Sequence, residues 1–337
     1  MKRCFYPMFI ALIASINCMA QTGVSISTAN CNDHIDAKSR SEIKLLDDKI
    51  IAAFNENDPH LLISLYSERL QKDAAGKSEE FINTVHPVIT SKNYALLDEY
   101  LYKSSAIGNV GTVFKGQSED NDYSINFNIY STETYISLLL YKGPINEFLF
   151  TVIYGKYADS WKIDVIRVGP YKVLGKDAVD FYKLAENYLA KGDLIDAGIN
   201  LRLTQQLCLP AEQIFVYFKF PEMKEFGTKL AQEGEAKISF PLKISQISST
   251  PQVFDLEPVV LKEGVFPSIK YLSTIRLEDT TALRKENDQI KGVIGKIFPG
   301  IDRDNKYIFF KAYNQMPDGK TPVHTYGFML KKGDESK

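Results

Sequence analysis

The sequence predicts an α+β protein in which a pair of helices joins two sheet-bearing domains. Apolar residues recur at helical spacing through residues 41–88, and aromatic and β-branched runs separated by turn residues follow through residues 96–168. A second succession of strands and helices begins after residue 234. The length of 337 residues is enough for two domains of ordinary size. We therefore expect an N-terminal domain, a helical brace and a C-terminal α+β domain, at 40–172, 173–234 and 235–337.

The composition is that of a globular protein, with 45% hydrophobic and 24% charged residues. The formal charge is −2 at pH 7, and the basic residues do not gather into clusters. Because binding to nucleic acid depends on positive charge, these features argue against nucleic acid as the main partner.

Residues 1–20 have the pattern of a secretory signal peptide. Two basic residues precede the apolar run Phe5–Ile16, which is too short to span a bilayer. Small residues then favour a cut between Ala20 and Gln21. We expect an exported protein, periplasmic or secreted, whose first mature residues 21–39 form a mobile arm.

Cys18 opens an alternative, in which the protein is a lipoprotein acylated on that cysteine. A bacterial lipobox has Leu three residues before the cysteine and a small residue just before it. Ser15 and Asn17 stand at those positions, so we favour plain export.

Two cysteines, Cys31 and Cys208, remain beyond the predicted leader. In an oxidising compartment they can form a disulfide, which would tie the arm to the end of the helical pair. The alternative is a pair of free thiols, one on the arm and one buried. The sequence leaves both open.

Three helices are expected to begin the N-terminal domain. Ile43, Leu46, Ile50 and Phe54 recur at helical spacing in the first, and Asn57-Asp58-Pro59 can cap the second. The predicted helices span 41–55, 59–66 and 78–88, with a loop at 71–77. Six strands follow, at 96–102, 111–115, 123–130, 135–141, 147–154 and 161–168.

This order of elements, with Leu65-Tyr66-Ser67 closing the second helix and Trp161-Lys162-Ile163 in the last strand, resembles a known superfamily. It is similar to the nuclear-transport-factor-two-like, or ketosteroid-isomerase-like, cone, over about residues 40–170. The segment Phe54–Asp58 is typical of that superfamily. The resemblance implies an N-terminal cone of three helices on a curled antiparallel sheet, enclosing a pocket for a small apolar molecule or a substrate.

Isomerases of the superfamily that this part of the chain resembles need a carboxylate base and a hydroxyl that stabilises an oxyanion. The candidate base here is Asp98, and the candidate donors are Tyr66, Tyr100 and Tyr130. As walls of the pocket we expect Tyr66, His86, Tyr100 and Trp161. Each also has a structural interpretation: Asp98-Glu99 as a solvated strand end, His86 as a capping residue, and the aromatic residues as core.

Residues 181–210 resemble one tetratricopeptide unit of two helices joined by a Gly-Asp turn. The matching positions are Phe181, Leu184, Ala185, Tyr188, Gly192, Asp193, Ala197 and Pro210. A single unit cannot bury its own apolar faces, and we find no second copy, so we expect a brace between domains.

The C-terminal part predicts an antiparallel sheet with one packed helix. Residues 211–233 look helical, with an interruption at Pro221. The remaining elements are strands at 237–245, 252–261 and 268–277, a helix at 280–297, and a hairpin of strands at 307–312 and 324–330.

No motif for a metal or cofactor is found. The four histidines have no partners at ligand spacing, and a Gly-x-Ser-x-Gly nucleophile motif is absent from the sequence. We therefore expect neither a metal nor a cofactor. The favoured function is non-enzymatic binding of a small apolar ligand or a protein partner in the cell envelope. The alternatives are a cone-fold isomerase or hydratase that uses Asp98 with a Tyr, and a structural docking subunit. A homodimer is one assembly that remains open.

Overall fold

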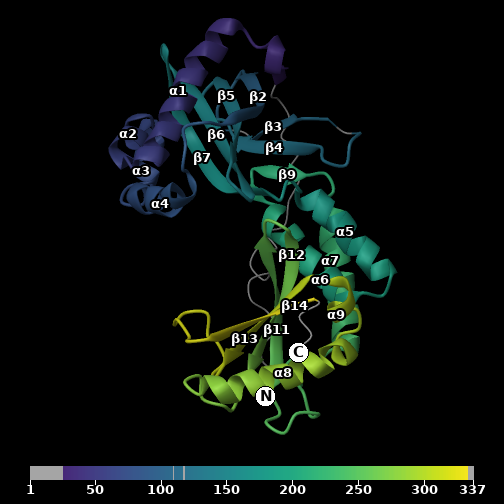
Figure 1. Cartoon of the computed structure of the whole chain (residues 1–337). Coiled ribbons are helices and arrows are strands. Elements are labelled where there is room, and N and C mark those ends of the chain that lie inside the picture. The colour runs from purple at the N-terminus through teal and green to yellow at the C-terminus, as the bar shows by residue number, and fades with distance from the viewer. Residues whose placement is uncertain (1–25, 109, 117, 333–337) are drawn as a thin grey trace.

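The computed structural model describes residues 26–108, 110–116 and 118–332, and the predicted leader lies outside them (Figure 1). The α+β class is confirmed. A short strand begins the described chain, helices follow it, and the other strands of a five-stranded antiparallel sheet come next. A pair of helices then leads to a second sheet. None of the described helices combines the length and the apolar character that crossing a bilayer requires.

The N-terminal sheet has the strand order β1-β2-β5-β6-β7, and every neighbouring pair is antiparallel. Its strands are β1 (Ile26–Cys31), β2 (Ala95–Ser104), β5 (Glu133–Lys142), β6 (Asn146–Tyr157) and β7 (Ser160–Val173). One face packs on the N-terminal helices, which are α1 (Ala37–Glu56), α2 (Pro59–Ser64), α3 (Glu68–Asp73) and α4 (Ser78–Val85). Fully buried rings of Phe54 and Phe150 lie at the centre of this layer.

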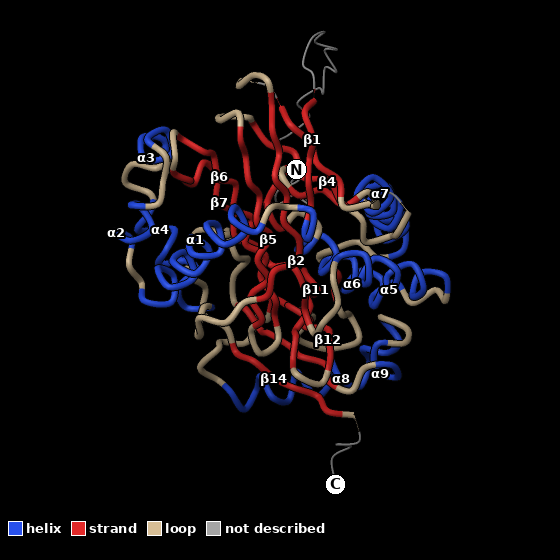
Figure 2. The backbone as a smooth tube through the Cα atoms, turned by 90° about the horizontal axis from the view of Figure 1, so that it is seen from above, coloured by secondary structure: helices blue, strands red, loops and turns tan. Residues whose placement is uncertain are grey.

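The opposite face of the N-terminal sheet is covered by a second layer, so its strands are buried on both sides. That layer contains a three-stranded sheet of β3 (Val110–Phe114), β4 (Tyr123–Asn128) and β9 (Phe215–Tyr217), with β8 (Pro210–Gln213) beside it. It also contains α5 (Ala178–Ala190), α6 (Leu194–Leu207) and α7 (Phe220–Lys237). Figure 2 shows α1–α4 and α5–α7 on opposite sides of the strands.

The helical pair α5–α6 connects the two halves of the molecule. Asp177 caps α5 through a capping box with Asp180, and Gly192 takes a positive φ of 81° at the turn. Leu201 and Leu203 on α6 belong to the core beneath the N-terminal sheet, whereas Ile195 belongs to the C-terminal core. Helix α6 therefore contributes to both cores.

The C-terminal sheet is mixed, which corrects the antiparallel prediction. Its order is β10 (Leu242–Lys243), β11 (Gln252–Leu261), β12 (Gly264–Leu272), β13 (Tyr307–Tyr313) and β14 (Tyr326–Lys331). Strands β12 and β13 run parallel because α8 (Thr280–Ile297) and α9 (Ile301–Asp304) carry the chain back along the sheet before β13 begins. Leu283, Ile290 and Ile294 on α8 are fully buried against the sheet.

Three local predictions were wrong. Residues 21–39 were expected to form a mobile arm, of which residues 21–25 lie outside the described residues. Residues 26–31 form β1, whose hydrogen bonds to β2 hold them in the sheet, and residues 37–39 begin α1. The expected loop at 71–77 begins inside α3. The expected helix at 211–233 starts only at Phe220, so Pro221 stands in its first turn, where proline is tolerated. Residues 210–213 and 215–217 form strands instead.

Candidate functional site

The site is built on the buried face of α1. Asp36 caps the helix by accepting a hydrogen bond from Ser39 N, and Asn57 ends it in a left-handed conformation. Ile43, Asp47 and Ile50 follow one another at helical spacing on the face turned towards the sheet. The helix therefore places a carboxyl group within an otherwise apolar stripe.

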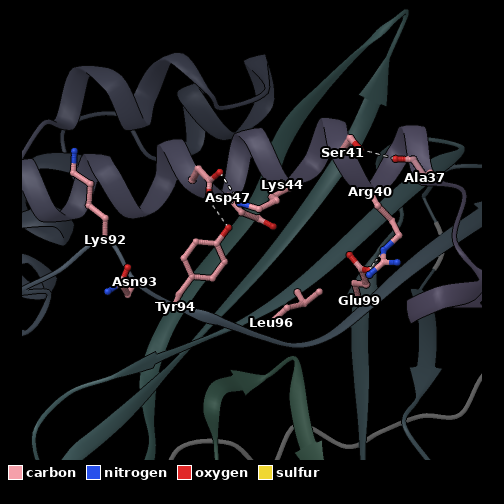
Figure 3. Close-up of a pocket in the computed structure, with 11 residues that line it drawn as sticks. Ala37, Arg40, Ser41, Lys44, Asp47, Lys92, Asn93, Tyr94, Leu96 and Glu99 are labelled. Atoms are coloured by element: carbon pink, nitrogen blue, oxygen red, sulfur yellow. Dashed lines mark hydrogen bonds and ion pairs between the residues drawn. The ribbon is translucent and has the colours of Figure 1, made fainter.

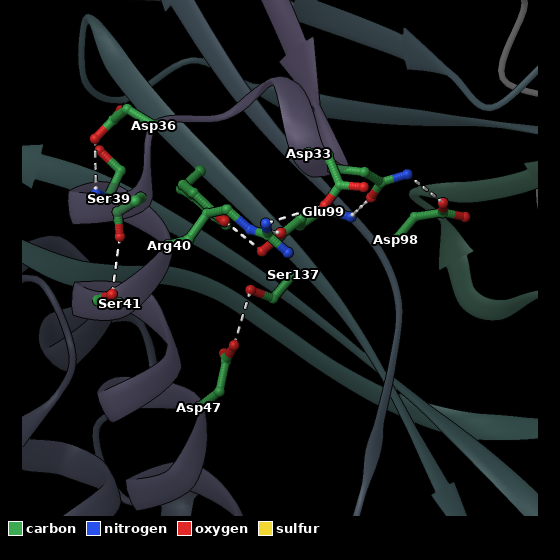
Figure 4. Close-up of polar contacts among 12 residues, drawn as sticks. Asp33, Asp36, Ser39, Arg40, Ser41, Asp47, Asp98, Glu99 and Ser137 are labelled. Atoms are coloured by element: carbon green, nitrogen blue, oxygen red, sulfur yellow. Dashed lines mark hydrogen bonds and ion pairs between the residues drawn. The ribbon is translucent and has the colours of Figure 1, made fainter.

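Asp47 is only 3% exposed, and two hydroxyl groups of the sheet donate to it. Tyr154 OH on β6 lies 2.6 Å from Oδ1. Ser137 Oγ on β5 lies 3.1 Å from Oδ2 (Figure 4). Burial raises the pKa of Asp47 to about 7, although these hydrogen bonds work in the opposite direction. The carboxyl group can therefore change its protonation state near neutral pH.

Glu99 on β2 forms a second buried acidic group near the first. Its oxygens accept hydrogen bonds from Arg40 Nε on α1 and from Tyr135 OH on β5. Its backbone N–H donates to Asn32 Oδ1 at 3.0 Å. Negative charge on Glu99 contributes to the raised pKa of Asp47. The two acids therefore form one electrostatic unit beneath α1.

Above these acids lies an open groove of about 630 Å³, which we call the α1–β2 groove (Figure 3). One wall is α1 and the other is β2 with the residues just before it. The lining residues are Ala37, Arg40, Ser41, Lys44, Asp47, Asp48, Lys92, Asn93, Tyr94, Leu96 and Glu99. The volume falls within the range of about 300–1,000 Å³ that is typical of ligand sites.

The cationic side chains of the α1–β2 groove are all paired within the chain. Lys44 lies 2.8 Å from Asp48, Arg40 pairs with Glu99, and Lys92 pairs with Glu56, which lies outside the groove. Tyr94 OH also donates to Asp48 at 2.7 Å. The groove is therefore polar but nearly neutral, which does not favour a strongly charged ligand.

Asp98 lies on the face of β2 opposite Glu99, outside the groove. It accepts hydrogen bonds from Lys115 Nζ at 2.7 Å and from Tyr123 OH at 2.5 Å. Tyr100 is the one predicted oxyanion donor that the structure brings near it, through a 3.5 Å contact with Tyr123 OH. Burial raises the pKa of Tyr100 to about 12. Asp98 and Tyr100 thus form part of a buried network between two sheets.

Tyr66 and Tyr130, the other predicted donors, lie elsewhere. Tyr66 is buried in the core under the helices, and burial raises the pKa of its hydroxyl. The ring of Tyr130 lies beneath the guanidinium group of Arg69, with 3.7 Å from the guanidinium carbon to the ring centre. Neither of them lines the α1–β2 groove.

The remaining predicted pocket residues make structural contacts. His86 Nδ1 lies 2.9 Å from the carbonyl oxygen of Phe54, which ties α4 to α1. Trp161 is buried and donates its Nε1 hydrogen to Glu42 at 3.1 Å, with its ring edge-on to Tyr135. Together with Tyr66 and Tyr100, they do not converge on the groove.

Cys31 and Cys208 are both free thiols in the structure, which therefore contains no bridge between them. Cys31 is exposed at the end of β1, whereas Cys208 is buried in the core at the end of α6. Burial raises the pKa of Cys208 to about 11.

In the part of the chain that the structure describes, no group of three His, Cys, Asp or Glu side chains could hold a metal.

Sequence reasoning missed Asp47 and Glu99 as site residues. A signal for Asp47 was present, because an acid four residues after Ile43 and three before Ile50 lies on an apolar helical stripe.

Comparison with known proteins adds no further assignment: no protein-family model, curated protein or solved structure matches the chain.

Proposed function

We propose that the protein is a non-catalytic binding protein of the cell envelope that holds a segment of a partner protein in the α1–β2 groove. The observation that carries this proposal is the groove itself, about 630 Å³ of open volume between α1 and β2. Its location in the envelope rests on the predicted leader, which directs export.

The side chains favour a protein segment over a small apolar ligand. Between the helices and the N-terminal sheet, the space that would hold an apolar ligand is occupied by fully buried side chains such as Phe54, Leu139 and Phe150. The groove, in contrast, is lined mostly by polar and charged residues. Such a surface suits the mixed polar and apolar character of a polypeptide.

The resemblance to the nuclear-transport-factor-two-like cone remains part of this proposal. It is supported by the order of elements, in which helices precede four of the five strands of an antiparallel sheet and cover one of its faces. The α1–β2 groove lies at the border of that covered face. We therefore propose that the partner binds at the border of the covered face and not in the interior of the cone, which side chains fill.

Native mass spectrometry tests the proposed function. The protein would be purified gently from the cells that produce it, as wild type, as the variant Ser41→Arg, and as the control Leu45→Arg. Ser41 lines the groove, whereas Leu45 is 64% exposed on the same helix and does not line it. We expect a bound polypeptide on the wild type and the control but not on Ser41→Arg. A polypeptide retained equally by all three, or by none, would refute the proposal.

Asp47 supports a second candidate function, acid–base catalysis. A buried carboxyl group with a pKa of about 7 at the edge of a groove has the properties of a general base. In this candidate function the general base is Asp47 and not Asp98, because Asp98 already accepts hydrogen bonds from Lys115 and Tyr123. A panel of small enolisable ketones in deuterated water tests it. Catalysis requires deuterium exchange that Asp47→Asn abolishes and Asp98→Asn retains, and no exchange by the wild type would eliminate this candidate.

A further inference from the structure

We infer that the partner segment binds as an extra β-strand along the free edge of β2, in line with β1. This inference rests on the proposed function, because it specifies how the α1–β2 groove holds a polypeptide. The occupant is an extended, uncharged segment of a partner protein. It would be recognised through its backbone and through small or apolar side chains.

The first argument comes from the pairing of β2. Strand β1 pairs only with the second half of β2, and the register ends where Cys31 faces Tyr100. On its other side, β2 pairs with β5 from Ala95 onwards. Within the described parts of the chain, residues 95–98 thus have a strand on one side and none on the other. Such an edge is a template for another strand.

Asn32 marks the point where the pairing stops. Its side chain accepts a hydrogen bond from Glu99 N and donates one to Asp98 Oδ1, both at 3.0 Å. Asn32 therefore satisfies the backbone at Glu99 in place of a strand. Along residues 95–98, the backbone groups that do not bond to β5 face the position that a new strand would take, and the shift of register between Leu96 and Asp98 interrupts their alternation.

The second argument is the wall that faces this edge. Ala37, Ser41, Lys44 and Asp48 follow at intervals of four, three and four residues, so they form one stripe along α1. Leu96, which is 42% exposed, lies opposite this stripe on β2 (Figure 3). A strand added to β2 would direct alternate side chains towards the α1 stripe and Leu96.

The third argument is charge. Lys44 and Asp48 neutralise each other, and Arg40 is neutralised by Glu99. A charged segment would have to break these pairs, at a cost in free energy, before it could form its own. A peptide backbone carries dipoles but no net charge, so it can bind while the pairs stay in place. This favours recognition by main-chain hydrogen bonds.

Selection of peptides and backbone methylation test the inference. A displayed library of random linear peptides, each of about ten residues, would be selected on the full exported chain. Selected peptides would be resynthesised, and each would be N-methylated at one position at a time. In an added strand only every second N–H bonds to the neighbouring strand. We expect an alternating pattern, with affinity lowered about tenfold at one set of positions and almost unchanged at the other.

Two further outcomes separate the inference from the proposed function. Peptides that lose binding on Ser41→Arg, keep it on Leu45→Arg, and show no alternation would refute strand addition while leaving the groove as the binding site. If no peptide is selected, or if Ser41→Arg has no effect on the selected peptides, both the strand and the groove proposal are wrong. An alternating pattern together with loss of binding on Ser41→Arg supports both.

Discussion

Tyr154 on β6 donates a hydrogen bond of 2.6 Å to Asp47 on α1, a residue 107 positions away in the chain. The contact fixes α1 against the N-terminal sheet and keeps the carboxyl group directed into the protein. Because both residues are buried, the hydroxyl group replaces the water that the carboxyl group has lost. The wall of the groove and the protonation of Asp47 therefore depend on the same contact.

Replacing Asp47 with Asn should change how stability depends on pH. The pKa of Asp47 is raised from 3.8 to about 7 on folding. Between these values the folded protein holds a proton that the unfolded chain has lost, so the wild type becomes less stable as pH rises. The difference between the free energies of unfolding of wild type and Asp47→Asn should shift by up to about 4 kcal/mol from pH 4 to pH 8, in favour of the variant. Urea titrations at several pH values measure it.

Asp48 provides the matched control for this prediction. Burial opposes the shift, but hydrogen bonds from Lys44 and Tyr94 lower the pKa of Asp48 below 3.8. Its contribution to stability is present above the unfolded pKa and is lost only as pH falls through the folded value. Between pH 5 and 8, Asp48→Asn should therefore change the slope of the free energy of unfolding against pH much less than Asp47→Asn does, because the charge of Asp48 is only a minor cause of the raised pKa of Asp47. An equal change of slope in both variants would contradict the assignment of this pH dependence to Asp47.

Tyr154→Phe should destabilise the protein by about 2 kcal/mol, because it leaves a buried carboxyl oxygen without its donor. The measurement is the free energy of urea unfolding at pH 8, where Asp47 is ionised. Tyr94→Phe removes a similar bond, to the exposed Asp48, and should cost less than about 1 kcal/mol. Equal losses of stability in the two variants would show that the buried hydrogen bond contributes no more than the exposed one.

Gly169→Ala should be strongly destabilising. A Cβ at this position of β7 would lie 2.1 Å from the carbonyl oxygen of Pro210 in β8, and a backbone atom cannot rotate away. We expect a loss of about 3 kcal/mol. Gly198→Ala is the control: a Cβ there meets nothing within 4 Å on α6, so it should stabilise by about 0.5–1 kcal/mol. Thermal unfolding distinguishes the two, and a neutral Gly169→Ala would show that β7 and β8 are further apart.

The two cysteines should react with alkylating reagent at different rates. Exposed Cys31 should react in the folded protein. Cys208 should react only on unfolding, because it is buried and its pKa is raised to about 11. Both should be labelled in denaturant without prior reduction, as peptide mapping can show. A peptide pair that is released only by a reductant would establish the disulfide instead.

Local pattern was enough to predict most of the fold. The stripe of Ile43, Ile50 and Phe54 predicts α1, and the capping signal at Asp58 predicts the start of α2, which the structure confirms. Pairing between distant segments could not be predicted in the same way. The parallel pairing of β12 with β13 depends on the path of α8, and β9 joins β4 from about ninety positions away.

The candidate site was harder to predict than the fold. Asp98 and Glu99 are adjacent acids, and only the three-dimensional register shows which of them faces α1. A shift of register between Leu96 and Asp98 alters the alternation of faces along β2, so the sequence pattern alone is ambiguous there. Asp98 was chosen as the candidate, whereas Glu99 lines the groove.

Site-specific photo-cross-linking in the cells that produce the protein tests the central claim most directly. A photoreactive residue would replace Ser41, which lines the α1–β2 groove, or Leu45, which lies on the same helix outside it. The account predicts a discrete protein adduct from position 41 and none from position 45. Absence of an adduct at position 41, or the same adduct at both positions, would contradict it.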